Sequence, residues 1–164
     1  MRGFGIQETL VALSIAALVA ALGSSAWHGW LRQQQLATFS ALLLADLQHA
    51  RTLALSSDTE IQVCALDART FPGSGDWTLG WRLERLLGGE PTVLSQQLAP
   101  AGRVRVLSTQ SLLNGFVFNS RGFARLAGGS FAAGSWTLCA GLPQSRVITL
   151  SGSGRLRISD GSPC

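Results

Sequence analysis

The sequence predicts an α+β protein in which one long N-terminal helix packs on a C-terminal antiparallel β domain of two sheets. Two features of the apolar pattern predict this class. An uncharged apolar segment leads into a stretch with apolar residues at every third or fourth position, which is typical of a helix. From Thr59 onwards, apolar residues recur at every second position between glycine-rich turns, which is typical of short strands.

The first half of the expected helix is uncharged. Residues 9 to 31 contain no Asp, Glu, Arg or Lys, and as a helix these 23 residues would be about 34 Å long, enough to cross a hydrocarbon core of roughly 30 Å. Trp27 and Trp30 close the segment, where aromatic rings favour a membrane interface. We therefore expect residues 4–30 to be a transmembrane segment.

Two other roles for this segment fit the sequence less well. A secretory signal peptide has a basic N-terminal region, but here Arg2 is the only basic residue before the apolar run, and Glu8 lies directly against that run. A helix buried in a globular core would be apolar on one face, whereas this segment is apolar on all faces. The carboxylate of Glu8 needs a partner in such a place, and a neighbouring α-amine would provide one.

A stripe of apolar residues continues the helix as far as a stop signal at residues 56–58. Its spacings of three and four residues predict a helix face that packs on the globular domain. The stripe consists of Leu36, Phe39, Leu43, Leu47, Ala50 and Ala54.

Alternating apolar residues predict the strands of the C-terminal region. Turn signals such as the glycine pairs at 88–89 and 128–129 separate the strands, and their close spacing favours antiparallel pairing in two sheets. The expected inward-facing residues are Ile61, Val63 and Ala65; Leu79, Trp81 and Leu83; Val104 and Val106; Phe116 and Phe118; Trp136 and Leu138; Leu156 and Ile158.

Nothing in the composition or motifs indicates an enzyme. All thirteen basic residues are arginine, which excludes a P-loop lysine, a Schiff-base lysine and a lysine general base. The chain has no HExxH, G-x-S-x-G or G-x-G-x-x-G motif, and neither His28 nor His49 has a nucleophile signature close by. With no C-x-x-C motif and no histidine near a cysteine, we expect neither a metal nor a cofactor.

Positive charge is concentrated in the C-terminal region. Residues 103–164 contain seven arginines and one acid, a formal charge of +6, whereas residues 1–102 carry −2. Such asymmetry favours a polyanionic partner. An acidic polysaccharide or lipid headgroups would satisfy the same charge as well as a nucleic acid does.

Two arginines near the C-terminus have the spacing that phosphate recognition needs. Arg155 and Arg157 alternate with apolar residues, so on a strand both point outward about 6.5–7 Å apart. Each guanidinium could bind one phosphate, and Gly154 would let the ligand backbone approach. Arg103 and Arg105 repeat the arrangement. Most outward arginines on strands are merely solvated, and the spacing alone favours that explanation over phosphate binding. Because no aromatic residue is adjacent to this segment, the contact expected with a nucleic acid is with phosphate rather than base readout.

The N-terminal residues MRGFGIQE resemble the start of a type IV prepilin. The resemblance implies that residues 1–3 are a leader removed after Gly3 by the prepilin peptidase. It implies that Phe4 becomes the N-methylated N-terminus and that Glu8, fifth in the mature chain, serves assembly. Gly5 and Gln7 depart from the family's usual residues.

The remainder resembles the FimT/GspH group of minor pilins and pseudopilins. The similarity rests on LQHARTLALSSDTEIQVC around the helix end, DWTLGW at 76–81, NSRGFA at 119–124, WTLC at 136–139 and GRLR at 154–157. It implies a pilin-like fold with a periplasmic globular domain over residues 31–164. It also implies a chain anchored once in the inner membrane and then moved into a pilus with other major and minor pilins.

The cysteine count is odd, and the sequence alone leaves the pairing open. Members of this group often have four cysteines, and the expected partner of Cys64 is missing before DWTLGW. The resemblance therefore implies a Cys139–Cys164 disulfide and a free, buried Cys64.

In FimT-type members a C-terminal GRxR motif is associated with DNA binding in natural transformation. Gly154, Arg155 and Arg157 match that motif, while Arg103 and Arg105 lie outside it and are supporting candidates. The resemblance thus implies a minor type IV pilin that binds DNA by its phosphate backbone without sequence preference. The alternative is a structural pseudopilin of the GspH type, in type II secretion or as a pilus-priming pilin, that binds no nucleic acid.

Overall fold

The computed structural model describes residues 5–66, 75–87, 90–99 and 104–164, and it confirms the α+β class. Within these ranges one long helix, α1 (Ile6–Ser57), precedes the strands and a short 3₁₀ helix, η1 (Gln110–Leu112). The left-handed backbone of Asp58, with φ 50°, ends α1 at the expected stop signal.

Two antiparallel sheets follow the helix in the chain. The first has the order β3-β2-β1-β5-β6 and the second the order β4-β7-β8-β9, so β9 is an edge strand. The strands are β1 (Glu60–Ala65), β2 (Gly80–Leu87), β3 (Glu90–Leu98), β4 (Arg105–Ser108), β5 (Phe116–Phe118), β6 (Ala124–Arg125), β7 (Gly134–Cys139), β8 (Ser145–Leu150) and β9 (Leu156–Gly161).

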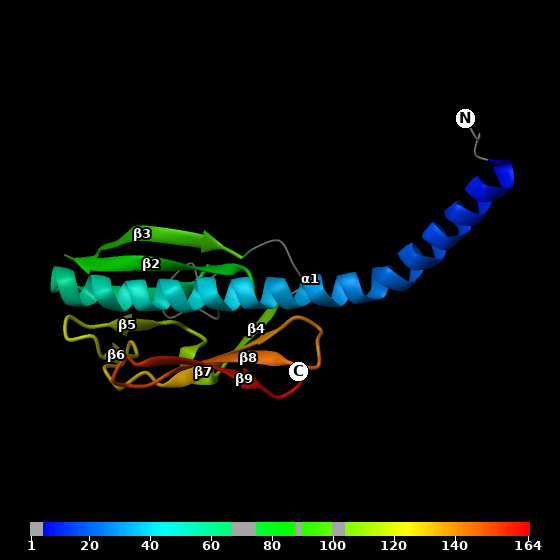
Figure 1. The fold of residues 1–164 in the computed structure, drawn as a ribbon. Coiled ribbons are helices and arrows are strands. Elements are labelled where there is room, and N and C mark those ends of the chain that lie inside the picture. The colour runs from blue at the N-terminus through cyan, green and yellow to red at the C-terminus, as the bar shows by residue number, and fades with distance from the viewer. Residues whose placement is uncertain (1–4, 67–74, 88–89, 100–103) are drawn as a thin grey trace.

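The second half of α1 runs between the two sheets, with β2 and β3 on one side and β7, β8 and β9 on the other (Figure 1). All six residues of the predicted apolar stripe are buried there. Phe39 meets Trp81 of β2 edge to face, with ring centroids 5.6 Å apart. The prediction that this face packs on the globular domain is therefore confirmed.

The first half of α1 leaves the sheets and projects away from them (Figure 1). Its apolar side chains lie on the surface, among them Ile6, Leu10, Leu13 and Leu18. No helix among the described residues combines the length and the apolarity that a membrane span needs, so the span expected over residues 4–30 is not confirmed.

Tryptophans link the helix and the two sheets. The Trp81 Nε1–H donates to Asp46 of α1 over 2.8 Å, and the Trp77 Nε1–H donates to the Leu112 carbonyl oxygen over 3.2 Å. Trp77 also packs edge to face on Trp136 of β7. These contacts explain the tryptophans of the DWTLGW segment as core residues that join the layers.

One predicted inward position is wrong. Leu79 precedes β2 and is 54% exposed, whereas Trp81 and Leu83, which follow it in the chain, are buried as predicted. Gly80 lies between them with φ +128°, and this turn into the strand breaks the alternation.

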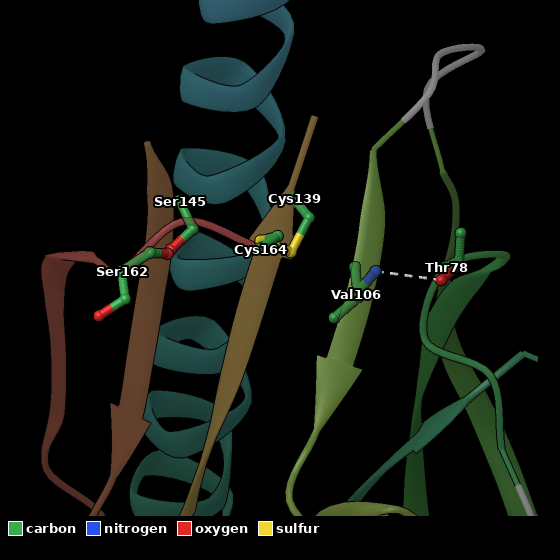
Figure 2. The surroundings of a disulfide bond; sticks show 6 residues. All are labelled: Thr78, Val106, Cys139, Ser145, Ser162 and Cys164. Atoms are coloured by element: carbon green, nitrogen blue, oxygen red, sulfur yellow. Dashed lines mark hydrogen bonds between the residues drawn. A yellow bond between two sulfur atoms is a disulfide. The ribbon is translucent and has the colours of Figure 1, made fainter. Parts of the chain in front are cut away.

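The C-terminal tail is fixed to the second sheet. Cys139 at the end of β7 and Cys164 form a disulfide, the pairing that the resemblance implied, and the hydroxyl of Ser145 donates to the Ser162 carbonyl oxygen over 2.6 Å (Figure 2). On the adjoining edge strand the Val106 N–H donates to Thr78 Oγ1 over 3.1 Å, which joins β4 to the segment before β2.

Cys64 is free and buried in β1, as expected. Burial raises the pKa of its thiol, although the Arg82 Nε–H donates to Sγ over 3.3 Å and opposes that shift. The thiol therefore stays protonated and shielded at neutral pH.

We expect loss of the disulfide to lower the free energy of unfolding. A loop of 25 residues gives about 3 kcal/mol from the entropy of the unfolded chain. Urea unfolding of the full chain in non-ionic detergent, followed by tryptophan fluorescence, measures the loss in Cys139→Ser/Cys164→Ser. The control Ser145→Ala removes only a hydrogen bond to the tail and should cost about 1 kcal/mol. Equal stability of the double variant and the wild type would contradict this account.

We expect Cys64 to resist alkylation while the chain is folded. Because its pKa is raised, the Cys64 thiol of the folded chain keeps its proton at pH values at which the thiol of the unfolded chain has lost it. The contribution of Cys64 to the free energy of unfolding therefore falls as the pH rises through about 8.5. Iodoacetamide labelling at pH 8, read by mass spectrometry, should be slow in buffer and fast in guanidinium. Rapid labelling of the native chain would show that the site opens.

Candidate nucleic-acid interface

The GRLR segment begins in the turn between β8 and β9. The Gly154 N–H donates to the Ser151 carbonyl oxygen over 2.8 Å, and the Ser151 N–H donates to the Arg155 carbonyl oxygen over 3.0 Å. The Ser151 hydroxyl also accepts from the Arg155 N–H over 3.2 Å. These bonds close a tight hairpin that fixes where Arg155 leaves the turn.

Gly154 is needed for contacts inside the protein. It is buried, and its φ of +75° belongs to the left-handed region that favours glycine. An added Cβ would fall on the Gly122 carbonyl oxygen and come within 3.0 Å of Arg51 Nε. The expectation that this glycine admits a ligand backbone is therefore wrong.

Arg51 of α1 holds two turns together. Its Nε–H donates to the Gly122 carbonyl oxygen over 3.1 Å, and its Nη2–H donates to the Ser153 carbonyl oxygen over 3.3 Å. Sequence reasoning missed this residue. The available signal was an arginine next to Ala50, on the edge of the buried helical stripe.

Arg155 and Arg157 are exposed and project from the same side of the hairpin. In the register Arg157 pairs with Thr149, and both arginines line an open cavity of about 350 Å³ with Thr149 and Ser151. Among the described residues neither guanidinium has an ion-pair partner. Two free guanidiniums beside two hydroxyls are suited to binding an anion with oxygen acceptors.

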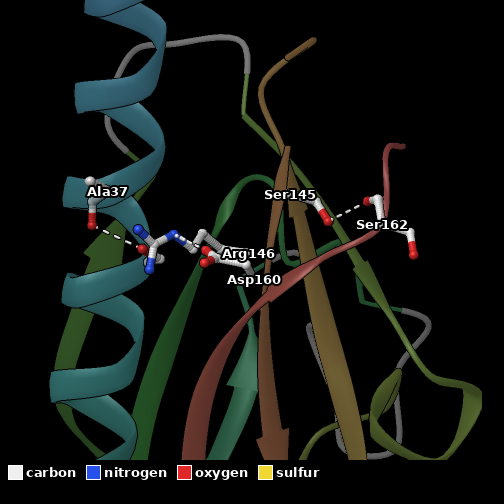
Figure 3. A network of polar contacts seen from close by, with 6 residues as sticks. Ala37, Ser145, Arg146, Asp160 and Ser162 are labelled. Carbon is white, nitrogen blue, oxygen red and sulfur yellow. Dashed lines mark hydrogen bonds and ion pairs between the residues drawn. The ribbon is translucent and has the colours of Figure 1, made fainter. Parts of the chain in front are cut away.

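The one acid of the basic C-terminal region faces away from this cavity. Asp160 pairs with Arg146 over 3.2 Å, on the side of the sheet that faces Ala37 of α1 (Figure 3). Strand alternation puts Arg157 on the opposite side. The face of β8 and β9 that carries Arg157 therefore also carries Val147, Thr149 and Ser159, and no described carboxylate.

The apolar side of β9 is only partly covered. Leu156 is half-buried, and Ile158 remains 37% exposed even though its register partner Ile148 is buried. The prediction that both face the core is correct for the direction of these side chains and wrong for the burial of Ile158. An edge strand lacks a neighbour on one side, which accounts for the exposure.

Arg105, one of the supporting candidates, does not lie close to Arg155 and Arg157. Arg105 is on β4 at the opposite edge of the same sheet, three strand positions or about 14 Å away from β9. Along the strands Arg105 is level with Cys139, whereas Arg157 is level with Ser135, which lies four residues before Cys139 in β7. Arg105 instead lines a cavity of about 560 Å³ with Arg32 and the disulfide.

The residues expected at the leader cleavage site, Gly3 and Phe4, are not among the described residues. Arg103 also lies outside the described residues. Glu8 is exposed in the first turn of α1, where the helix dipole favours a negative charge.

Aromatic residues lie closer to the hairpin than the sequence suggested. Phe131 packs on Gly152, where an added Cβ would be 3.0 Å from the Phe131 Cβ, and 60% of Phe131 is exposed. The expectation that no aromatic residue lies beside GRLR is therefore wrong. Phe131 precedes Gly152 by 21 positions in the sequence, so only tertiary structure reveals this contact.

Comparison with solved structures finds the same fold in a type IV minor pilin. Two crystal structures of FimU from Pseudomonas aeruginosa (strain PAO1) align with TM-scores of 0.64 and 0.61, each at 21% sequence identity. The first alignment covers 82% of this chain and 98% of FimU, and the second covers 79% and 99%. A comparison with curated proteins gives no match.

The family model described as "Type II transport protein GspH" matches residues 40–154, which is more than half of the chain. This match spans the helix end, the strands β1 to β8 and the hairpin turn that precedes Arg155, and it stops before β9. The chain belongs to the GspH family, and it has the fold of a minor pilin.

Proposed function

We propose that this protein is a minor type IV pilin that binds DNA through Arg155 and Arg157 and serves DNA uptake in natural transformation. The observation that carries the proposal is the pair of exposed guanidiniums, free of ion pairs within the described residues, in one cavity with Thr149 and Ser151. Phosphate oxygens match these donors, and contacts to phosphate carry no base sequence preference.

The N-terminal half of α1 supports a role in filament assembly. Its exposed apolar side chains need a cover, and the same half-helix of neighbouring pilins would provide one. The proposal includes cleavage after Gly3 by the prepilin peptidase, methylation of Phe4, and pairing of Glu8 with a neighbouring α-amine. It locates the globular domain outside the inner membrane, on a pilus.

A structural pseudopilin is the second candidate, because the matched family is that of the type II transport protein GspH. In that role the chain would prime or cap a filament and bind no nucleic acid. The free arginines favour the first candidate, and a binding measurement separates the two.

We expect the full chain in non-ionic detergent to retard duplex DNA on a gel at low salt and to release it at higher salt. Arg155→Ala/Arg157→Ala should weaken binding and make the slope of log Kobs against log[salt] less steep by about 1.8, because two phosphate contacts are lost. Arg105→Ala removes an exposed arginine at the other sheet edge and should leave the slope unchanged. Absence of retardation at every salt concentration favours the pseudopilin.

Processing gives an independent test. When the chain is expressed with a prepilin peptidase, mass spectrometry should find a product that begins at an N-methylated Phe4. Substitution Gly3→Glu should leave the precursor intact, while Gly5→Ala, two residues further on, should be processed. A Gly3→Glu chain cut at the normal position would refute the leader assignment.

A further inference from the structure

The turn that carries Arg155 is joined to an aromatic pair. Phe123 and Phe131 have ring centroids 6.2 Å apart, with 59° between their planes, and they are 37% and 60% exposed. Phe131 packs on Gly152, three residues before Arg155. Two neighbouring exposed rings on a surface of a folded domain indicate a contact site for a partner.

Backbone bonds fix this pair relative to the hairpin. The Ala124 N–H donates to the Gly152 carbonyl oxygen over 3.2 Å, and the Ala132 N–H donates to the Ala124 carbonyl oxygen over 2.9 Å. Ala124 directly follows Phe123, Ala132 directly follows Phe131, and both alanines are fully buried. The aromatic residues are therefore held against the hairpin at Gly152, three residues before Arg155.

An arginine orients the more exposed ring. The Arg125 guanidinium carbon is 5.0 Å from the Phe131 ring centroid, and its Nη1–H donates to the Gly129 carbonyl oxygen over 2.8 Å. The Arg125 guanidinium is thus engaged by the ring and by a backbone carbonyl oxygen. Phosphates are accordingly expected at Arg155 and Arg157, with Phe131 packed on the same hairpin at Gly152.

On this basis we propose that the surface formed by Phe123, Phe131, Arg155 and Arg157 binds single-stranded DNA in preference to duplex. An unpaired base has a free face that can stack on an aromatic ring, while its phosphates reach the arginines. In a duplex the base faces are covered by their neighbours, so only the arginine contacts remain. This inference rests on the proposed DNA binding and adds the strand form that the site selects.

Fluorescence anisotropy of the full chain in non-ionic detergent tests the preference. The probes are a labelled oligo(dT) of 20 nucleotides, which has no self-pairing, and a labelled blunt duplex of 20 base pairs. We expect the oligo(dT) to bind more tightly, and Phe131→Ala to weaken its binding by about tenfold, the effect of losing one stacked base. Duplex binding should change by less than about twofold in the same variant.

Two further variants keep the result interpretable. Phe131→Trp preserves an aromatic face and should retain binding of oligo(dT), whereas Leu107→Ala shortens an equally exposed apolar side chain on β4 and should have no effect. Equal affinity for both probes, or an equal loss for both in Phe131→Ala, would overturn the strand preference while DNA binding itself stands. If neither probe binds, the proposed function fails, and with it this inference.

Discussion

The proposed DNA-binding surface depends on one guanidinium, that of Arg51. It reaches from the helix to the carbonyl oxygens of Gly122 and Ser153, and so it ties together two turns that lie 31 residues apart in sequence. Gly122 and Gly154 both have φ +75°, and their turns approach so closely that a side chain at Gly154 would strike the other turn. The hairpin that carries Arg155 and Arg157 takes its place from this junction, and Phe131 packs on the same hairpin at Gly152.

The parts proposed for assembly and for DNA binding lie in different regions of the fold. The apolar first half of α1 projects from the domain (Figure 1), while Arg157 lies on the edge strand β9 of the second sheet and Arg155 directly precedes that strand. The free arginines have a competing explanation, because charged side chains on an edge strand also hinder edge-to-edge pairing with other chains. That role requires neither free guanidiniums in one cavity nor aromatic rings beside them.

Regular periodicity made much of the fold predictable. The helical stripe from Leu36 to Ala54 and the alternation in β7 record burial of one face within a single element. The strands β1 and β5 were also predicted from alternating apolar residues, although the structure buries the residues between them as well. The strand β3 escaped prediction because at an edge most of its residues are exposed on both faces, which leaves no alternation. The predicted inward position of Leu79 is wrong because the turn at Gly80, which directly follows it, breaks the alternation.

The site was predictable in part. The outward direction of Arg155 and Arg157 follows from alternation, but the sequence gives no strand order, so it could not show that Arg105 lies at the opposite edge. Contacts between turns, such as Phe131 on Gly152 and Arg51 on Gly122, join segments far apart in the chain and leave no periodic signal. Gly154 gives no periodic signal either, because glycine is required there by the Gly122 carbonyl oxygen of another turn.

The central claim is that the hairpin held by Arg51 is where DNA binds. Its most direct test is a titration of the ¹⁵N-labelled full chain with DNA, followed by amide chemical shifts. The account predicts shifts concentrated at residues 151–157 and 121–131, with those of β4 unmoved. Shifts confined to β4 and the cavity at Arg105, or no shifts at low salt, would contradict it.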